Sequence, residues 1–304
     1  MATFVILHGA TAGGWILGKV ARRLRKAGHD VFTPTYTGLG ERSHLLNREI
    51  GLDTHIQDVL NVLHFEELID VILVGISYSG MVITAVAEAV PERIDHLVYV
   101  DAFVPQDGES LADLCGTQVM AQVDEIVQTR GDGWLLPAFK EVEPRSTDHP
   151  IKTFYDKVDV KNPAATALPC TYICCTEKSE DSIFTKPLYQ MAQRAKDAGW
   201  RYRELPTDHL PERDMPDELT ALLLELAQCP AGVWYWVVGN GGVHSTRGRW
   251  RGHPVSHLPD PYPLFGAKTA SKTRQTLFVP TASLGYHRLQ AWHNHWDTID
   301  VRTD

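Results

Sequence analysis

A serine between a buried strand and a helix is the first residue in this sequence that could do chemistry. Residues 71–74 are apolar and mostly β-branched, which predicts a strand, and residues 81–90 predict a helix. The connecting segment is Gly75-Ile76-Ser77-Tyr78-Ser79-Gly80. A tight strand-to-helix turn of this kind points a serine hydroxyl out of the sheet as a nucleophile, in a G-x-S-x-G pattern. Here Ser79 replaces the last glycine, and an incidental serine in a glycine-rich turn is the alternative.

A serine hydroxyl needs a base that takes its proton, and the base needs an acid that orients it. His209 follows a predicted strand at residues 202–205 and precedes the closing helix, so we predict that it is the base. The alternative is an ordinary surface histidine. His8, directly after the first strand, is interpreted as a turn or pocket-edge residue.

The sequence offers more than one acid for this base. Asp101 ends a predicted strand among apolar residues, where a carboxylate needs a partner, and this favours it. Asp181 fits the usual chain order of serine, acid and histidine, although Lys178, Ser179 and Glu180 around it suggest a solvated loop. Glu177 is a third option.

Two backbone N–H groups should stabilise the oxyanion of an acyl-transfer reaction. We predict that Tyr78, the residue after the nucleophile, supplies one and that Ala10 supplies the other. Ala10 lies in a loop with Gly9, Gly13 and Gly14. A phosphate-binding loop is the competing interpretation, but its G-x-G-x-x-G and G-K-[ST] patterns are absent.

The elements around these residues alternate between strand and helix, which favours a mostly parallel, doubly wound α/β sheet. Strands are predicted at residues 3–7, 31–34, 71–74, 97–101, 171–175 and 202–205. Helices are predicted at residues 16–24, 53–63 with Asp53 as the cap, 81–90, 187–198 and 219–226. Residues 105–165 interrupt this alternation and are interpreted as a small helical cap over the sheet edge, with Trp134 as a candidate pocket wall.

The composition separates residues 1–229, a predicted single domain, from residues 230–304, an irregular C-terminal extension. Of the 29 basic and 38 acidic residues, 8 and 4 lie in the extension, so the main body has 21 and 34 and a net charge of −13. This acidic body argues against nucleic-acid binding. The extension holds five of the eight tryptophans and no glutamate, and an accessory segment, a disordered extension and sequence not selected as protein are the interpretations considered. Its His293 and His295 are too few for a metal site, so no metal is predicted.

The whole chain has the character of a soluble intracellular protein. Hydrophobic residues make up 43% and charged residues 22% of the 304 positions, and no apolar run is long enough to span a membrane. Neither a signal peptide nor a cysteine framework is visible among the first residues and the five cysteines, so we expect a cytoplasmic location. The oligomeric state stays open, with a homodimer as one option.

The main body resembles the α/β-hydrolase superfamily, in the group of plant methylesterases, hydroxynitrile lyases and small bacterial esterases. The resemblance lies in His8-Gly9-Ala10 through Trp15, the segment 75–80, residues 100–105 and Thr207-Asp208-His209. It implies the α/β-hydrolase fold, with Ser77 as nucleophile, His209 as base and Ala10 and Tyr78 as oxyanion donors. Plant members take the acid from the loop that holds Asp181 here, whereas similar bacterial proteins carry the aspartate that corresponds to Asp101.

The same resemblance separates hydrolysis from cyanohydrin cleavage. Lyases of the group carry threonine where this chain has Gly9 and lysine where it has Leu210, and an apolar Leu210 cannot stabilise a leaving cyanide. We therefore predict a cofactor-free serine esterase for small, largely apolar carboxylic esters, with Gly9, Trp134 and Leu210 beside the substrate. A hydroxynitrile-lyase-like enzyme and a non-catalytic ligand-binding protein are the alternatives.

Overall fold

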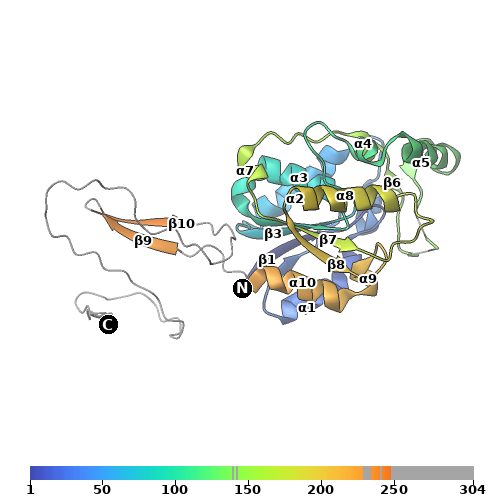
Figure 1. The fold of residues 1–304 in the computed structure, drawn as a ribbon. Helices are drawn as coiled ribbons and strands as arrows, with labels where there is room; N and C mark the ends of the chain where they lie inside the picture. The colour runs from blue at the N-terminus through green and yellow to red at the C-terminus, as the bar shows by residue number, and fades with distance from the viewer. Residues whose placement is uncertain (139, 142, 229–233, 240–241, 248–304) are drawn as a thin grey trace. The chain divides into compact units, whose positions relative to one another are not determined.

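Six parallel strands form the central sheet of this protein (Figure 1). The computed structural model describes residues 1–138, 140–141, 143–228, 234–239 and 242–247. The strands of the sheet are β1 (Thr3–Leu7), β2 (Asp30–Phe32), β3 (Val71–Ile76), β4 (Ile94–Val100), β7 (Cys170–Cys175) and β8 (Arg201–Leu205). Their spatial order is β2-β1-β3-β4-β7-β8, so β2 lies on one side of the first strand and the later strands are added in sequence on its other side. The predicted doubly wound α/β sheet is therefore confirmed.

Helices cover both faces of this sheet. Those that pack on it are α1 (Gly18–Lys26), α2 (Leu52–Phe65), α3 (Ser79–Ala89), α8 (Thr185–Asp197) and α10 (Pro216–Gln228). Figure 1 shows α2, α3 and α8 on one face and α1 and α10 on the other. Alternate strand residues serve the two faces: Val5 and Leu7 belong to the core under α2 and α3, whereas Phe4 and Ile6 belong to the core under α1 and α10. This two-sided burial explains why the strands are continuous apolar runs.

The chain between β4 and β7 forms the predicted cap. It contains α4 (Leu111–Cys115), α5 (Thr117–Arg130), α6 (Lys152–Tyr155), α7 (Pro163–Thr166) and the short antiparallel pair β5 (Leu135–Leu136) and β6 (His149–Pro150). Leu111, Val123 and Phe154 join the core cluster that includes α2 and α3. The cap is thus packed on the face of the sheet that carries α3.

Asp53 is not the cap of α2, which corrects the sequence expectation. The helix begins at Leu52, after Gly51, and the Leu52 N–H donates to Oδ2 of Asp156 at 2.9 Å. Gly51 leaves the room that Asp156 and Lys152 occupy, because a Cβ there would overlap both side chains. The helix start is thus capped by a carboxylate 104 residues away, which local sequence patterns do not reveal.

The remaining short elements are the 3₁₀ turns η1 (Gly14–Leu17), η2 (Gly40–Leu45) and η3 (Pro91–Arg93), the helix α9 (Pro211–Asp214), and two strands of the C-terminal extension. Those strands, β9 (Trp234–Gly239) and β10 (Gly242–Arg247), pair antiparallel with each other. His293 and His295 lie outside the described residues, so the expectation for them stays untested. Within the described part of the chain, no helix is both long and apolar enough to cross a bilayer.

Candidate active site

Ser77 sits on a left-handed turn between β3 and α3. Its φ is 55°, a conformation that residues with a side chain rarely adopt. The turn is held by the Ser77 N–H, which donates to Val100 O at 3.2 Å, and by the Phe103 N–H, which donates to Ser77 O at 3.1 Å. These bonds link the turn to the end of β4 and its continuation, and they hold Ser77 in its strained left-handed conformation.

The glycines of the turn are required by close backbone contacts. A Cβ at Gly75 would lie 2.7 Å from Ser79 O, and one at Gly80 would overlap the carbonyl of Phe103. The Ser79 hydroxyl donates to His8 O and lies 2.5 Å from the Tyr36 hydroxyl, so it ties α3 to the end of β1. The deviation from G-x-S-x-G is thereby explained, because Gly80 meets the packing requirement and Ser79 makes bonds that glycine lacks.

Ser77, His209 and Asp101 form one chain of hydrogen bonds. Nε2 of His209 lies 2.9 Å from Ser77 Oγ, and Nδ1 lies 2.7 Å from Asp101 Oδ2. An ionised carboxylate only accepts, so Nδ1 carries the imidazole proton and Nε2 presents its lone pair to the serine hydroxyl. The arrangement can remove a proton from Ser77 and hold the resulting imidazolium beside a carboxylate.

The carboxylate that reaches His209 belongs to Asp101. It directly follows β4, has a φ of 44° and is completely buried. Its N–H donates to Ile173 O at 2.7 Å and its Oδ1 accepts from the Cys175 N–H at 3.2 Å, so the neighbouring strand β7 orients it. Asp181 and Glu177 are exposed in the loop after β7, and neither is the carboxylate bonded to His209.

Lys178 is a residue of this site that sequence reasoning missed. Its side chain is only 1% exposed, and its Nζ donates to Asp101 Oδ1 at 2.7 Å and to the Cys175 carbonyl. The Tyr189 ring lies 3.9 Å from Nζ. Burial lowers the pKa of a lysine, but here the Asp101 charge and hydrogen bond outweigh burial and raise the pKa of Lys178. The charged residues around Lys178 in the sequence predict a solvent-exposed loop, so the burial of this side chain could not be predicted from them.

The loop after β1 runs directly against the serine. A Cβ at Gly9 would lie 3.3 Å from Ser77 Cβ and 3.8 Å from its Oγ, so glycine is the residue that allows this approach. Ala10 and Tyr78 are the residues that follow Gly9 and Ser77 in the chain, and their role as oxyanion donors stays a prediction. Thr11 then adopts a φ of 59°, and its N–H donates to His149 Nδ1 of the cap at 3.3 Å.

The other two predicted pocket residues differ in their surroundings. Leu210 follows His209, is partly buried and precedes α9. Trp134 lies in the cap, where the Arg48 guanidinium stacks 4.9 Å above its ring. This contact accounts for the position of Trp134 by packing, and its role as a pocket wall stays a prediction.

Three buried histidines lie beside the turn and form a neutral polar cluster. His8, His55 and His149 are inaccessible to solvent and bond to Tyr36 N, the Tyr78 hydroxyl and the Thr153 hydroxyl. Burial lowers the pKa of His8 to about 4 and that of His55 to about 3, and lowers the pKa of His149 well below its usual value. His8 is thus a buried structural residue rather than a pocket-edge residue.

Glu212 is a second buried carboxyl, and it interacts electrostatically with His209. It is 1% exposed, and its Oε2 has no hydrogen-bond partner among the described residues. Burial raises the pKa of Glu212 to about 7, and the charge of His209 opposes this effect. The carboxyl therefore changes its charge near neutral pH.

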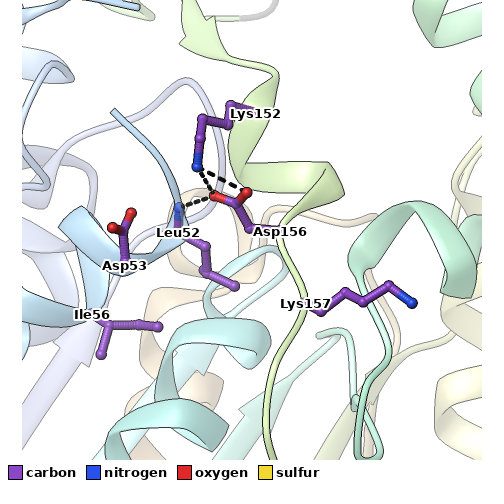
Figure 2. Close-up of a pocket in the computed structure, with 6 residues that line it drawn as sticks. All are labelled: Leu52, Asp53, Ile56, Lys152, Asp156 and Lys157. Carbon is purple, nitrogen blue, oxygen red and sulfur yellow. Dashed lines mark hydrogen bonds and ion pairs between the residues drawn. The ribbon is translucent and has the colours of Figure 1, made fainter. Parts of the chain in front are cut away.

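A surface cavity of about 320 Å³ lies away from these residues, at the start of α2 (Figure 2). Figure 2 shows Lys152 and Asp156 paired beside Leu52, with Asp53 and Lys157 pointing elsewhere. Asp156 uses both oxygens for Lys152 and one for the helix start, so the polar groups there already bind one another. Over the described ranges, no group of three or more His, Cys, Asp or Glu side chains could hold a metal ion.

Comparisons with known proteins agree with this architecture. The chain is 57% identical over 114 residues to the carbendazim hydrolyzing esterase of Nocardioides sp. (strain SG-4G), covering 38% of this chain and 47% of that protein. It is 25% identical over 255 residues to putative methylesterase 11 of Arabidopsis thaliana, covering 74% and 64%. The chain thus spans about half to two thirds of these relatives.

Solved structures share the fold over most of the described chain. An extracellular alpha/beta-hydrolase from a Paenibacillus species superposes with a TM-score of 0.63 at 25% identity, over 74% of this chain and 98% of that one. A pyrethroid hydrolase from Sphingobium faniae JZ-2 gives 0.62 at 21% identity, over 76% and 98%. The model of the alpha/beta hydrolase family matches residues 4–222, most of the chain. On this match, the protein belongs to the alpha/beta hydrolase family.

Proposed function

We propose that this protein is a serine esterase that cleaves a small, largely apolar carboxylic ester through an acyl-enzyme on Ser77. The observation that carries the proposal is the hydrogen-bonded chain from Ser77 through His209 to the buried Asp101, with bonds of 2.9 and 2.7 Å. Relatives named as esterases and methylesterases support the same reaction type.

In the proposed reaction, Nε2 of His209 takes the Ser77 proton while Oγ bonds to the ester carbonyl carbon. In this proposal the oxyanion accepts from the N–H groups of Ala10 and Tyr78, and the close approach of Gly9 to Ser77 supports the role of Ala10. The imidazolium then gives its proton to the alcohol oxygen, which leaves. Water adds to the acyl group as His209 takes its proton, and that proton returns to Ser77 Oγ as the acid is released.

Hydrolysis is favoured over cyanohydrin cleavage by the residue after the base. Leu210 has no charge with which to stabilise a leaving cyanide, and the buried Lys178 is already bound to Asp101. We therefore expect the wild-type protein to hydrolyse esters and to release no cyanide from a cyanohydrin.

The test is hydrolysis of p-nitrophenyl esters of increasing chain length by wild type, Ser77→Ala, Asp101→Asn and Asp181→Asn, with carbendazim as a further substrate. We expect losses of at least about a thousandfold in kcat for Ser77→Ala and Asp101→Asn. Asp181→Asn is the matched control and should retain activity, because Asp181 is exposed. Undiminished turnover in Ser77→Ala would refute the proposed mechanism.

A further inference from the structure

The carboxylate of Asp101 has two charged or chargeable partners rather than one. Oδ2 faces the imidazole of His209, and Oδ1 faces the ammonium of Lys178, each at 2.7 Å. Both members of the Asp101–Lys178 pair are inaccessible, with side-chain exposures of 0% and 1%. The lysine arises from the loop after β7, three residues beyond Cys175.

We propose that Lys178 is a positioning residue of the active site: it holds Asp101 through Oδ1 and, through that carboxylate, lowers the pH at which His209 becomes protonated. The inference rests on the proposed serine esterase for its catalytic meaning. Its physical part, the influence of one buried charge on a neighbouring imidazole, concerns these three side chains alone.

The geometric part of this role follows from the bonding of Asp101. Lys178 Nζ and the Cys175 N–H both donate to Oδ1, which leaves Oδ2 to the Nδ1–H of His209. The ammonium is itself held by the Cys175 carbonyl and by the Tyr189 ring, whose hydroxyl donates to Thr176 O at 3.0 Å. The plane of the carboxylate is thus set by contacts on the side away from the imidazole.

The electrostatic part follows from the sign of the charges. A lone carboxylate beside His209 would favour the imidazolium and so raise the pH at which the base is lost. The Lys178 charge opposes that field, so removing it should move the acid limb of the pH–activity profile to higher pH. A buried ion pair is by itself weak evidence for a stabilising role, because apolar side chains often replace both partners without loss of stability.

Several other ionisable groups lie around the pair, and the nearest carboxylate to the backbone of His209 is Asp208, whose Oδ1 accepts from the His209 N–H at 2.7 Å and from the Ser179 N–H at 3.3 Å. Cys174 Sγ lies 3.7 Å from Nζ. Burial raises the pKa of Cys174, and it raises those of Cys175 and Tyr172 far above neutrality. Tyr189 faces the ammonium through its ring. Burial raises the pKa of Glu212 to about 7, and the charge of His209 acts on it. Glu212→Gln is therefore needed to separate the titration of Glu212 from that of the histidine.

The experiment compares wild type, Lys178→Met and Lys178→Gln, each in the full chain and each with and without Glu212→Gln. The first measurement is the pH dependence of kcat/KM for p-nitrophenyl butyrate. We expect the acid limb to move up by about one pH unit in both neutral variants, since an opposite or like charge at this range changes titration by that order. The second measurement is the NMR titration of isotope-labelled histidine, with the His209 signal assigned by its absence in His209→Gln.

Lower activity with an unmoved acid limb and an unmoved His209 titration would overturn the proposal, because a purely structural lysine would give that result. If Ser77→Ala keeps its activity, the proposed esterase fails, yet the NMR titration still decides the effect of Lys178. If both neutral variants fail to fold, the double variant Asp101→Asn/Lys178→Met takes their place, because it buries no unpaired charge. It is compared with the single variant Asp101→Asn, which keeps the lysine. The His209 titration must then lie at higher pH in the double variant, and an equal value refutes the inference.

Discussion

Acid should unfold this protein unusually early, because several histidines are buried in the neutral form. Burial lowers the pKa of His8 and His96 to about 4 and that of His55 to about 3, and also lowers that of His149. The unfolded chain takes up these protons near pH 6.5, whereas the folded chain does not. Their stabilising contribution is therefore complete above pH 6.5 and is lost as the pH falls toward the folded-state values.

The size of the effect follows from proton counting. Each such histidine removes about 1.4 kcal/mol of stability per pH unit once the pH is well below 6.5. Glu212 acts in the opposite direction, because its raised pKa of about 7 stabilises the folded state as the pH falls from 7 toward 4.5. Four histidines against one glutamate leave a loss of about 5 kcal/mol between pH 6.5 and 5, which approaches the whole stability of an ordinary domain.

The assay is urea unfolding of wild type, His55→Gln and His44→Gln from pH 5 to 7.5. His55 bonds to the Tyr78 hydroxyl and the Thr37 carbonyl, and a glutamine amide can replace both functions without titrating. We expect His55→Gln to flatten the dependence of unfolding free energy on pH by about one proton. The exposed His44 is the matched control and should change nothing. Equal wild-type stability at pH 5 and pH 7 would refute the reasoning.

Two further predictions concern local contacts. Gly80→Ala places a methyl group on the Phe103 carbonyl and should lower the free energy of unfolding by at least about 3 kcal/mol or abolish labelling of Ser77 by a fluorophosphonate. Gly18→Ala is the control, because only the flexible Arg22 side chain is near that position. A clearly lower thermal unfolding temperature for Gly80→Ala than for Gly18→Ala supports the packing argument. Asp156→Ala should lower stability by about 1 kcal/mol in urea unfolding because α2 loses its cap, whereas Asp53→Ala should cost much less; a larger loss for Asp53→Ala would contradict the assigned cap.

The strand pattern and the turn around Ser77 were predictable because they depend on local sequence. Continuous apolar runs indicate strands covered on both faces, and a serine among small residues between a strand and a helix has few other structural explanations. His209 was predictable from chain order alone, since loops at the ends of parallel strands meet at one edge of a sheet. The catalytic roles of these residues remain predictions.

The contacts of Asp101 with His209 and Lys178 could not be predicted from the sequence, because they depend on how distant segments meet. Asp101 and Asp181 both follow strands, and the bend of the chain after β4, with a φ of 44° at Asp101, brings only the former to His209. Lys178 lies in a highly charged segment that predicts solvent exposure, yet its side chain turns inward to the buried carboxylate. Sequence patterns record hydrophobicity along the chain and not the direction of one long, flexible side chain.

The sequence by itself determined the layered α/β architecture, the strand-to-helix turn around Ser77 and the loop that carries His209, because hydrophobic periodicity and glycine placement act over a few neighbouring residues. Only the tertiary structure decided which carboxylate orients His209, which lysine neutralises that carboxylate, and which aspartate caps α2. Those choices join residues 77 to 108 positions apart. At such separations burial and charge pairing in the folded chain select the partner, and local propensity carries no information about it.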